Sequence, residues 1–340
     1  MTNRSPITIP VVVHVVWHRP EENLSDVGIL SQIEALNRDF NAENADLSTV
    51  PDEFQGLIGN IGIRFCLAAI DPYGNPTNGI IRKQCFTPGM GLMEALFFSS
   101  GGGSDAWNIS QYLNIWVADT GDWISGFGSY PGQTPPEKTG IVVHPKYFGL
   151  NGHPKFGLGR VATHEIGHFL GLKHIWGDSP DCSSDDEVAD TPLQGSAYNG
   201  CPDYPQNGCS ESEMFMNYMD YVEDPCMVLF TEGQKQRMLA TLFHPPSRIG
   251  NSPVLCLHND QISLSTWKAA PNPSKGQVFL TFEPPLMKLA RYSVYNCTGQ
   301  LIRQEEKLVN RELFIDLSEF PNGIYFLRID NHCQKIIISH

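Results

Sequence analysis

The chain has 340 residues, 41% of them apolar and 10% aromatic, and its formal net charge is −14. This length allows two domains, or one large and one small domain, and the composition is that of a globular protein. The negative charge argues against nucleic acid or an anionic membrane as a partner. The longest apolar runs are of strand length, so no transmembrane segment is predicted.

Strand-like and helix-like segments alternate in the first half of the chain. Residues 9–17 are predicted to form a buried strand, and residues 27–44 an amphipathic helix. Further strands are expected at 61–70, 112–119 and 140–145, and the last of them leads to a helix that carries several histidines. These elements predict an α/β half in which a mixed sheet precedes the histidine-bearing helix.

The second half of the chain has a different character. Residues 178–224 are rich in Asp, Gly, Pro, Ser and Cys, and helical order returns where Thr231 and Gln234 form a capping-box pattern. A Pro-containing connection follows, where we place a boundary between domains 1–258 and 262–340. Short strands are predicted beyond it, which together suggest a small β-sandwich: 277–282, 291–296, 300–308, 312–317, 324–329 and 334–339.

The stretch ATHEIGHFLGLKHIW holds the residues with the clearest chemistry. His164 and His168 are four residues apart, so on a helix they share one face, and Glu165 points roughly 100° away. His174 would lie about 15 Å beyond His164 in an unbroken helix, too far to bind the same metal. Gly171 is the residue best able to end the helix and turn the chain back. The spacing therefore predicts a zinc site of three histidines.

Glu165 decides between a structural and a catalytic zinc site. Three neutral histidines would leave one coordination position for water, and Glu165 could accept a proton from that water. A structural site would be closed by a fourth side chain and would need no base. The alternative to a metal site is a polar helix face with ordinary histidines. The alternatives to a peptidase are a non-catalytic surface-bound protein that keeps its metal, and an enzyme that hydrolyses a non-peptide amide.

The cysteines indicate export. Cys182, Cys201, Cys209 and Cys226 cluster in the loop-rich region without C-x-x-C spacing, so we predict two disulfides, for which three pairings exist. Four free thiols in a cytosolic enzyme are the alternative. Residues 1–17 do not form a convincing secretory signal, so export implies that a leader is missing from this sequence.

HEIGHFLGLKH, followed about fifty residues later by NYMDY, resembles the pappalysin family of metzincin metallopeptidases over roughly residues 9–244. The resemblance implies an α+β catalytic domain, with a twisted mixed sheet plus helices and zinc at the floor of a cleft. It also implies a secreted zinc endopeptidase that acts on proteins or peptides. Met219 would form a tight turn beneath the metal, and Tyr221 would help to stabilise the tetrahedral intermediate. Met214 and Met216 lie nearby, but only Met219 fits the N-Y-M-x-Y pattern.

The same resemblance implies three further features. It pairs the cysteines as Cys182–Cys209 and Cys201–Cys226. It suggests calcium binding by Asp190 and the carbonyl of Thr191, where a merely solvated acidic loop is the alternative. It also suggests an edge strand that binds the substrate backbone, where a Gly-rich surface hairpin is the alternative; its residues are Gly126, Phe127, Gly128, Ser129 and Tyr130.

The tail carries a second resemblance. APNPSKGQVFL, YNCTGQLI, LSEFPNGIYFLRID and QKIII together resemble the C-terminal sorting domain of type IX secretion cargo. This resemblance implies a Gram-negative bacterium, the type IX secretion machinery as a partner, and release or surface attachment of the protein. A carbohydrate-binding or protein-binding sandwich is the alternative.

The residues leave cleavage specificity open. Relatives that cleave next to Arg or Lys need an acidic group in the pocket, and Glu223 and Asp224 are near the expected place. Met227 and Val228 follow closely, so an apolar pocket is equally compatible with the sequence.

Overall fold

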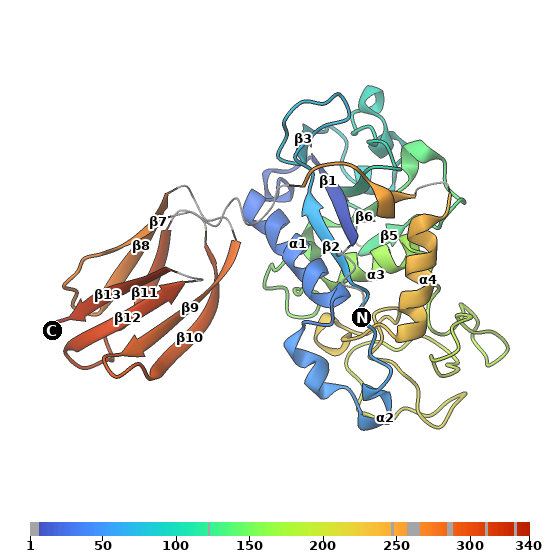
Figure 1. The fold of residues 1–340 in the computed structure, drawn as a ribbon. Coiled ribbons are helices and arrows are strands. Elements are labelled where there is room, and N and C mark those ends of the chain that lie inside the picture. Colours follow the sequence, from blue (N-terminus) through green and yellow to red (C-terminus); the bar gives the residue numbers. More distant parts are fainter. Residues whose placement is uncertain are drawn as a thin grey trace. The chain divides into compact units, whose positions relative to one another are not determined.

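The computed structural model describes residues 7–121, 123–245, 248–256, 266–283, 288–309, 312–329 and 332–340. Contacts divide the chain into two compact units, residues 1–257 and 258–340 (Figure 1). The boundary that we predict between 258 and 262 falls in a segment, 257–265, outside the described residues. Each unit is described by itself below.

The first unit is built on a six-stranded mixed sheet. Its strand order is β2-β1-β4-β6-β5, with β3 paired to the second half of β1. Only β5 runs antiparallel to its neighbour, β6, and it lies at the edge of the sheet. The strands are β1 (Ile7–Trp17), β2 (Ile63–Leu67), β3 (Ile80–Gln84), β4 (Leu113–Ala118), β5 (Gly126–Gly128) and β6 (Ile141–Val143).

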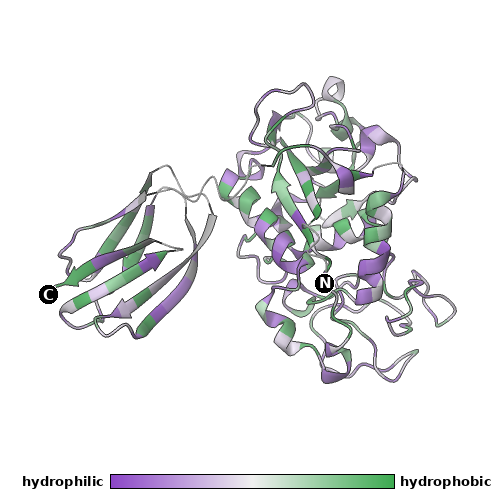
Figure 2. Ribbon diagram, viewed as in Figure 1, coloured by the Kyte–Doolittle hydropathy of each residue, from purple (hydrophilic) through white to green (hydrophobic). Residues whose placement is uncertain are grey.

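Helices cover this sheet and complete the core. They are α1 (Asp26–Phe40), α2 (Asp52–Gln55), α3 (Arg160–Phe169) and α4 (Glu232–Phe243). The apolar face of α1 packs with the central strands and α3 in one hydrophobic cluster. Figure 2 shows the central strands of this sheet mostly in green, the colour of hydrophobic residues. None of the described helices is long and apolar enough to cross a membrane.

Local signals set where the helices begin and end. Ser25 caps α1 by accepting a hydrogen bond from Gly28 N (3.2 Å). The helix stops at Phe40, earlier than the predicted residue 44, because Ala42 takes a left-handed φ of +50°. The side-chain amide of Asn41 donates there to the carbonyls of Asn37 (2.7 Å) and Ile63 (2.8 Å). The capping box that starts α4 is confirmed, with both of its hydrogen bonds formed.

The second unit consists of two antiparallel sheets, in the orders β10-β9-β12-β13 and β11-β8-β7. Apolar side chains from both sheets form one cluster, so the predicted all-β sandwich is confirmed. The first strand was not predicted from the sequence. The strands are β7 (Thr266–Ala270), β8 (Gln277–Glu283), β9 (Lys288–Asn296), β10 (Leu301–Val309), β11 (Glu312–Asp316), β12 (Gly323–Ile329) and β13 (His332–Ile338).

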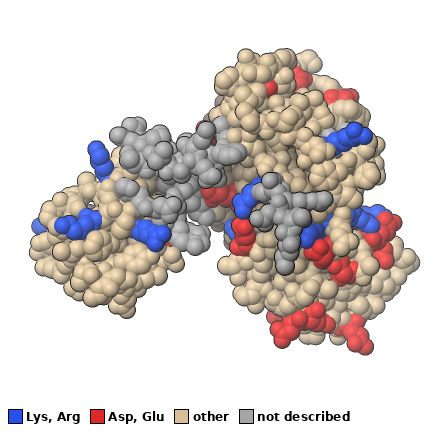
Figure 3. All heavy atoms as spheres, in the orientation of Figure 1, with Lys and Arg blue, Asp and Glu red and all other residues tan. Residues whose placement is uncertain are grey.

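The excess of acidic residues is unevenly distributed. On the face shown in Figure 3, acidic side chains gather toward the end of the first unit where α2 lies. Helix α2 itself begins with Asp52 and Glu53, both exposed. Carboxylates in the first turn are favourable because they face the positive end of the helix dipole.

Candidate active site

Helix α3 places the histidines and the glutamate of the metal-binding pattern on a buried segment. His164, Glu165 and His168 each expose only 5–6% of their surface. The helix ends before Gly171, whose φ of +87° lies in the left-handed region, and Gly171 N donates to His168 O (2.9 Å). The chain then turns back and returns His174 to the same place, as the spacing predicts.

The three imidazoles converge on one point. The candidate ligand atoms of His164, His168 and His174 all lie within 4.8 Å of one another, and Nε2 of His168 is 3.0 Å from Nε2 of His174. Among the residues that the structure describes, no other group of three or more His, Cys, Asp or Glu side chains is arranged to hold a metal.

Each ring has a hydrogen-bond partner at Nδ1, which leaves Nε2 for a metal. The partners are the carbonyl oxygens of Tyr218 for His164 (2.7 Å) and Leu172 for His168 (2.9 Å), and Oδ1 of Asp178 for His174 (2.5 Å). Burial lowers the pKa of all three histidines, that of His168 to about 4, so the rings are neutral. Three neutral, oriented imidazoles fit zinc, which in catalytic sites takes three protein ligands and keeps one position open.

Aromatic side chains hold the third histidine. Trp176 stacks on His174 with ring centroids 4.3 Å apart and planes 7° from parallel. Tyr221 packs edge-on against both rings, with centroids 4.8 Å from His174 and 4.7 Å from Trp176. Tyr221 stays 47% exposed, so its phenol borders the cleft beside the histidines.

Met219 lies directly beneath α3. It is fully buried, and a Cβ added to Gly167 of α3 would lie 2.4 Å from its sulfur. Met214 and Met216 are also buried, but neither is among the nearest atoms to Gly167. The main chain next to Met219 supports the site as well, because the carbonyl of Tyr218 accepts from His164.

Glu165 lies against the edge strand β5. An added Cβ on Gly126 would lie 3.2 Å from Glu165 Oε1, and one on Gly128 would lie 2.4 Å from Glu165 O. Both positions therefore need glycine for this close approach. Without a bound cation, burial raises the pKa of Glu165 to about 8, opposed by a hydrogen bond from the backbone of Gly128; the positive charge of a metal on the neighbouring histidines would lower this pKa and favour the carboxylate.

The residues after β5 have roles other than strand pairing. The strand ends at Gly128. Ser129 makes two hydrogen bonds with Gly140: its backbone N donates to Gly140 O (2.9 Å), and its Oγ accepts from Gly140 N (2.9 Å). The hydroxyl of Tyr130 lies 2.9 Å from Nδ1 of His168. Tyr130 therefore belongs to the surroundings of the metal-binding histidines.

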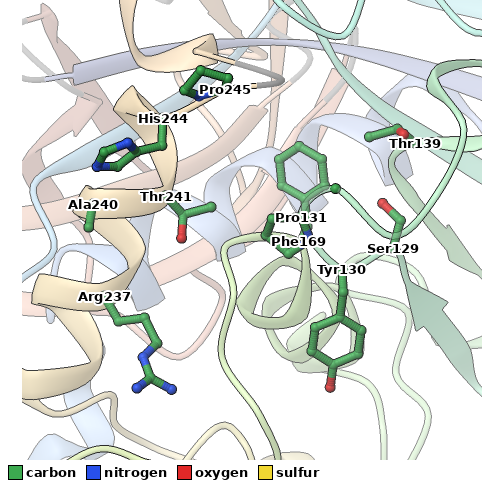
Figure 4. Close-up of a pocket in the computed structure, with 11 residues that line it drawn as sticks. Ser129, Tyr130, Pro131, Thr139, Phe169, Arg237, Ala240, Thr241, His244 and Pro245 are labelled. Atoms are coloured by element: carbon green, nitrogen blue, oxygen red, sulfur yellow. The ribbon is translucent and has the colours of Figure 1, made fainter.

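These residues line one open cleft with a volume of about 480 Å³. Besides the histidines and Glu165, its walls include the edge strand, Tyr221, Asp224 and the exposed Trp123. A separate apolar hollow lies between the loop after β5 and α4, and its lining includes Phe169, Thr241 of α4 and His244 (Figure 4). Tyr130 lines both, but the hollow contains none of the three histidines.

Asp224 lies buried at the cleft wall. Its Oδ2 accepts from the backbone N of Leu158 (2.8 Å) and Arg160 (3.3 Å), whereas Oδ1 has no hydrogen-bond partner among the described residues. Burial raises the pKa of Asp224 to about 6. Glu223 pairs instead with Lys155 (2.8 Å).

The loop after α3 is held by disulfides. The structure joins Cys182 to Cys209 and Cys201 to Cys226. A third disulfide, left open by the sequence, joins Cys66 of β2 to Cys256. Cys85, Cys297 and Cys333 are free.

The side chains of the candidate calcium residues have partners within the protein. Asp190 accepts from Thr231 Oγ1 (2.7 Å) and from Gly233 N (2.8 Å), and so caps the start of α4. Thr191 donates through its hydroxyl to Asp186 (2.7 Å). Asp186 is buried, and its second carboxylate oxygen has no partner among the described residues.

Sequence reasoning missed two contacts of the site. They are made by Trp176 and Asp178, neither of which belongs to the pattern of histidines and glutamate in the sequence. The one local signal for Asp178 is a carboxylate four residues after the last histidine. Its contact depends on a left-handed φ of +58° at Asp178, which spacing alone does not reveal.

Comparisons with known proteins cover both units. A peptidase M43 model, described as pregnancy-associated plasma protein-A, matches residues 102–243. A secretion system C-terminal sorting domain model matches residues 268–339. An extracellular metalloprotease of Arthroderma gypseum is 31% identical over 244 residues, which are 69% of this chain and 72% of that protein.

Solved structures agree with these matches. Mature mirolysin of Tannerella forsythia, in complex with a cleaved peptide, is 47% identical with a TM-score of 0.69; the match covers 73% of this chain and 95% of that chain. A promirolysin mutant from the same organism is also 47% identical, with a TM-score of 0.69 and coverage of 72% and 83%. The protein is therefore a secreted zinc-dependent endopeptidase with a C-terminal sorting domain, and it belongs to the pappalysin family of metzincin metallopeptidases.

Proposed function

We propose that Glu165 acts as general base and general acid in peptide-bond hydrolysis, beside zinc held by His164, His168 and His174. The observation that carries this proposal is the convergence of three neutral imidazoles next to a buried carboxylate in one open cleft. Zinc, when bound, supplies a Lewis acid that activates water and polarises the scissile carbonyl.

The side chains of the protein move the proton and stabilise charge. Glu165 would accept a proton from the attacking water and pass it to the leaving amine. Its position against the glycines of β5 keeps the carboxylate at the level of a peptide lying along that strand. Tyr221 would donate a hydrogen bond to the carbonyl oxygen as that oxygen gains negative charge. Met219 would support the histidines from below.

The edge strand would bind the substrate backbone. Gly126, Phe127 and Gly128 pair with β6 on one side only, which leaves the other edge of the strand for a peptide. Backbone pairing provides affinity without sequence selectivity. Ser129 and Tyr130 would keep the end of this strand in place through their contacts with Gly140 and His168.

We infer that the pocket prefers Lys or Arg directly after the scissile bond. The support is Asp224 in the wall of the cleft that holds Glu165, because its Oδ1 has no hydrogen-bond partner among the described residues. A buried acceptor without a donor is costly, and a basic side chain would supply both donor and charge. Met227 in the same wall would contact the aliphatic part of that side chain. Asp224→Asn should therefore reduce cleavage before Lys and Arg more than cleavage elsewhere.

We also propose structural calcium at the acidic loop, with Asp190 and the carbonyl of Thr191 as ligands. Oxygen-rich loops suit this cation, and Asp186 adds a buried carboxylate oxygen that has no partner in the part of the chain that the structure describes. The test is the melting temperature of zinc-loaded protein with and without added calcium. A calcium-induced rise that Asp190→Asn abolishes supports the site, and the absence of any rise contradicts it.

The two domains would have separate functions, one in catalysis and the other in export of the protein. We propose that residues 1–258 form the catalytic domain and residues 262–340 the domain recognised by the type IX secretion machinery of a Gram-negative bacterium. The match of residues 268–339 to a secretion sorting domain supports this division. Deletion of residues 262–340 should leave peptide cleavage intact and abolish export in a host with that machinery.

The central experiment is hydrolysis of a proteome-derived peptide library by the zinc-loaded protein and by Glu165→Ala of equal zinc content. Cleavage by the parent alone supports the assignment, with an expected loss of roughly 10²-fold or more from removal of the base. Tyr221→Phe should lower kcat roughly 10²-fold with little change in KM. Equal cleavage by Glu165→Ala would overturn the role of Glu165.

A further inference from the structure

One exposed aromatic side chain borders the active-site cleft. Trp123 exposes 86% of its surface and Ile124 exposes 39%, and both line the cleft that contains Glu165. Tyr73 and Phe86 are equally exposed, at 90% and 91%, but do not line this cleft. Trp123 and Ile124 therefore form an apolar surface continuous with the catalytic cleft.

Hydrogen bonds hold the described residues before and after Trp123. On one side, Gly121 N donates to Asp119 Oδ1 (2.8 Å). On the other, the hydroxyl of Thr120 donates to Ile124 O (2.5 Å), and Ser125 O accepts from the backbone of His144 (2.9 Å). The exposed indole is therefore held near the cleft by its own main chain.

The distance to Glu165 identifies which part of a substrate would reach this surface. Gly126 lies at the level of Glu165, because its added Cβ would be 3.2 Å from Oε1. Trp123 lies three residues earlier, in a turn before the strand, so the chain between them spans at most about 10 Å, the length of two to three extended substrate residues.

The direction of the strand decides the side of the scissile bond. A peptide that adds to β5 in the more stable antiparallel orientation runs opposite to that strand. Its residues after the scissile bond then lie beside the N-terminal end of β5, where Ile124 and Trp123 are found.

We propose that Trp123 and Ile124 form a subsite for an apolar side chain at the second or third position after the scissile bond. This subsite rests on the proposed endopeptidase function and is separate from the Asp224 pocket, which takes the first position. Contact with the indole face buries apolar surface of both partners, and hydrogen bonds already hold Gly121 and Ile124 on either side of Trp123.

The test compares cleavage of a peptide library by the parent, Trp123→Ala and Phe86→Ala. We expect Trp123→Ala to lose roughly 10-fold in kcat/KM for peptides with apolar or aromatic residues at the second or third position. Its preference at the first position should stay as in the parent. Phe86→Ala removes an equally exposed aromatic outside the cleft and should match the parent throughout.

An unchanged profile for Trp123→Ala, or a change only before the scissile bond, would overturn the subsite. Peptide affinity separates this result from failure of the proposed function. Zinc-loaded Glu165→Ala should bind apolar peptides about 10-fold more tightly than the same protein with Trp123→Ala added. Equal affinities would overturn the subsite even if the parent cleaved nothing, whereas an inactive parent would overturn the proposed function alone.

Discussion

Trp176 covers one face of the His174 ring, with the two rings nearly parallel and 4.3 Å apart. His174 is the one candidate zinc ligand outside α3, so no helix fixes its ring. The stacked indole of Trp176 fixes the orientation of the His174 ring instead, and Trp176 also packs against Tyr221.

Replacing Trp176 by alanine should therefore weaken zinc binding by roughly 10-fold or more, since groups that orient metal ligands have effects of this size. Competition with a chromophoric chelator measures the affinity. Trp176→Phe keeps an aromatic face on His174 and should retain most of the affinity. Unchanged zinc affinity in Trp176→Ala would show that the stack does not position the ligand.

The carboxylate of Asp178 should strengthen the same ligand. It accepts the hydrogen bond from Nδ1 of His174, whereas the other two histidines have carbonyl acceptors. Asp178→Asn suits the left-handed backbone, which asparagine tolerates, and removes only the charge. We expect roughly 10-fold weaker zinc binding. Asp181→Asn, an exposed carboxylate in the same loop, is the matched control and should bind zinc like the parent.

The contact between β5 and α3 has no room for a methyl group. A Cβ on Gly128 would lie 2.4 Å from the carbonyl oxygen of Glu165, and neither backbone can move without displacing the site. Gly128→Ala should lower stability by about 1–3 kcal/mol and sharply reduce peptide cleavage. Thermal unfolding and kcat/KM measure the two effects. Gly56→Ala, where nothing lies within 4 Å of the new Cβ, should change neither.

His14 should make stability depend on pH. It is fully buried in β1, within hydrogen-bond distance of Ser104 (2.8 Å) and Asn114 (3.1 Å), and burial lowers its pKa from 6.5 to about 4. The unfolded chain binds this proton more readily than the folded protein. The free energy of unfolding therefore keeps its full value above pH 6.5 and decreases as the pH drops from 6.5 toward 4. The pKa difference between the unfolded and folded states, 6.5 against about 4, makes this decrease about 3 kcal/mol.

The difference in unfolding free energy between pH 7.5 and pH 4 isolates this contribution. His14→Gln should reduce that difference by about 3 kcal/mol, whatever its effect on stability at pH 7.5. Other titrating groups are common to both proteins and cancel in the comparison. An identical pH dependence in the variant would refute the assignment to His14.

Features that depend on local spacing could be predicted from the sequence. The positions of His164 and His168 follow from helix periodicity, and Gly171 explains how His174 returns to them. The buried strand β1 follows from its apolar run, and α4 from its capping box.

Features that depend on contacts between distant parts of the chain could not be predicted from the sequence. Strand β3 has three charged or polar residues among its five and is recognisable only through its pairing with the second half of β1. The sequence places Asp224 near the site but does not show that one of its oxygens lacks a partner among the residues that the structure describes. The stack of Trp176 on His174 likewise requires the path of the chain after Gly171.

The disulfide between Cys66 and Cys256 joins the two ends of a chain segment that contains the catalytic residues, and so closes that segment into a covalent ring. The ring begins in β2, contains all three histidines, Glu165 and Tyr221, and ends just before the connection to the second unit. Beside it, Ala69 N donates to Leu255 O (2.9 Å), which adds a backbone bond to the same closure. A cut in the chain after Cys256 would therefore release the tail and leave that ring unbroken around the active site.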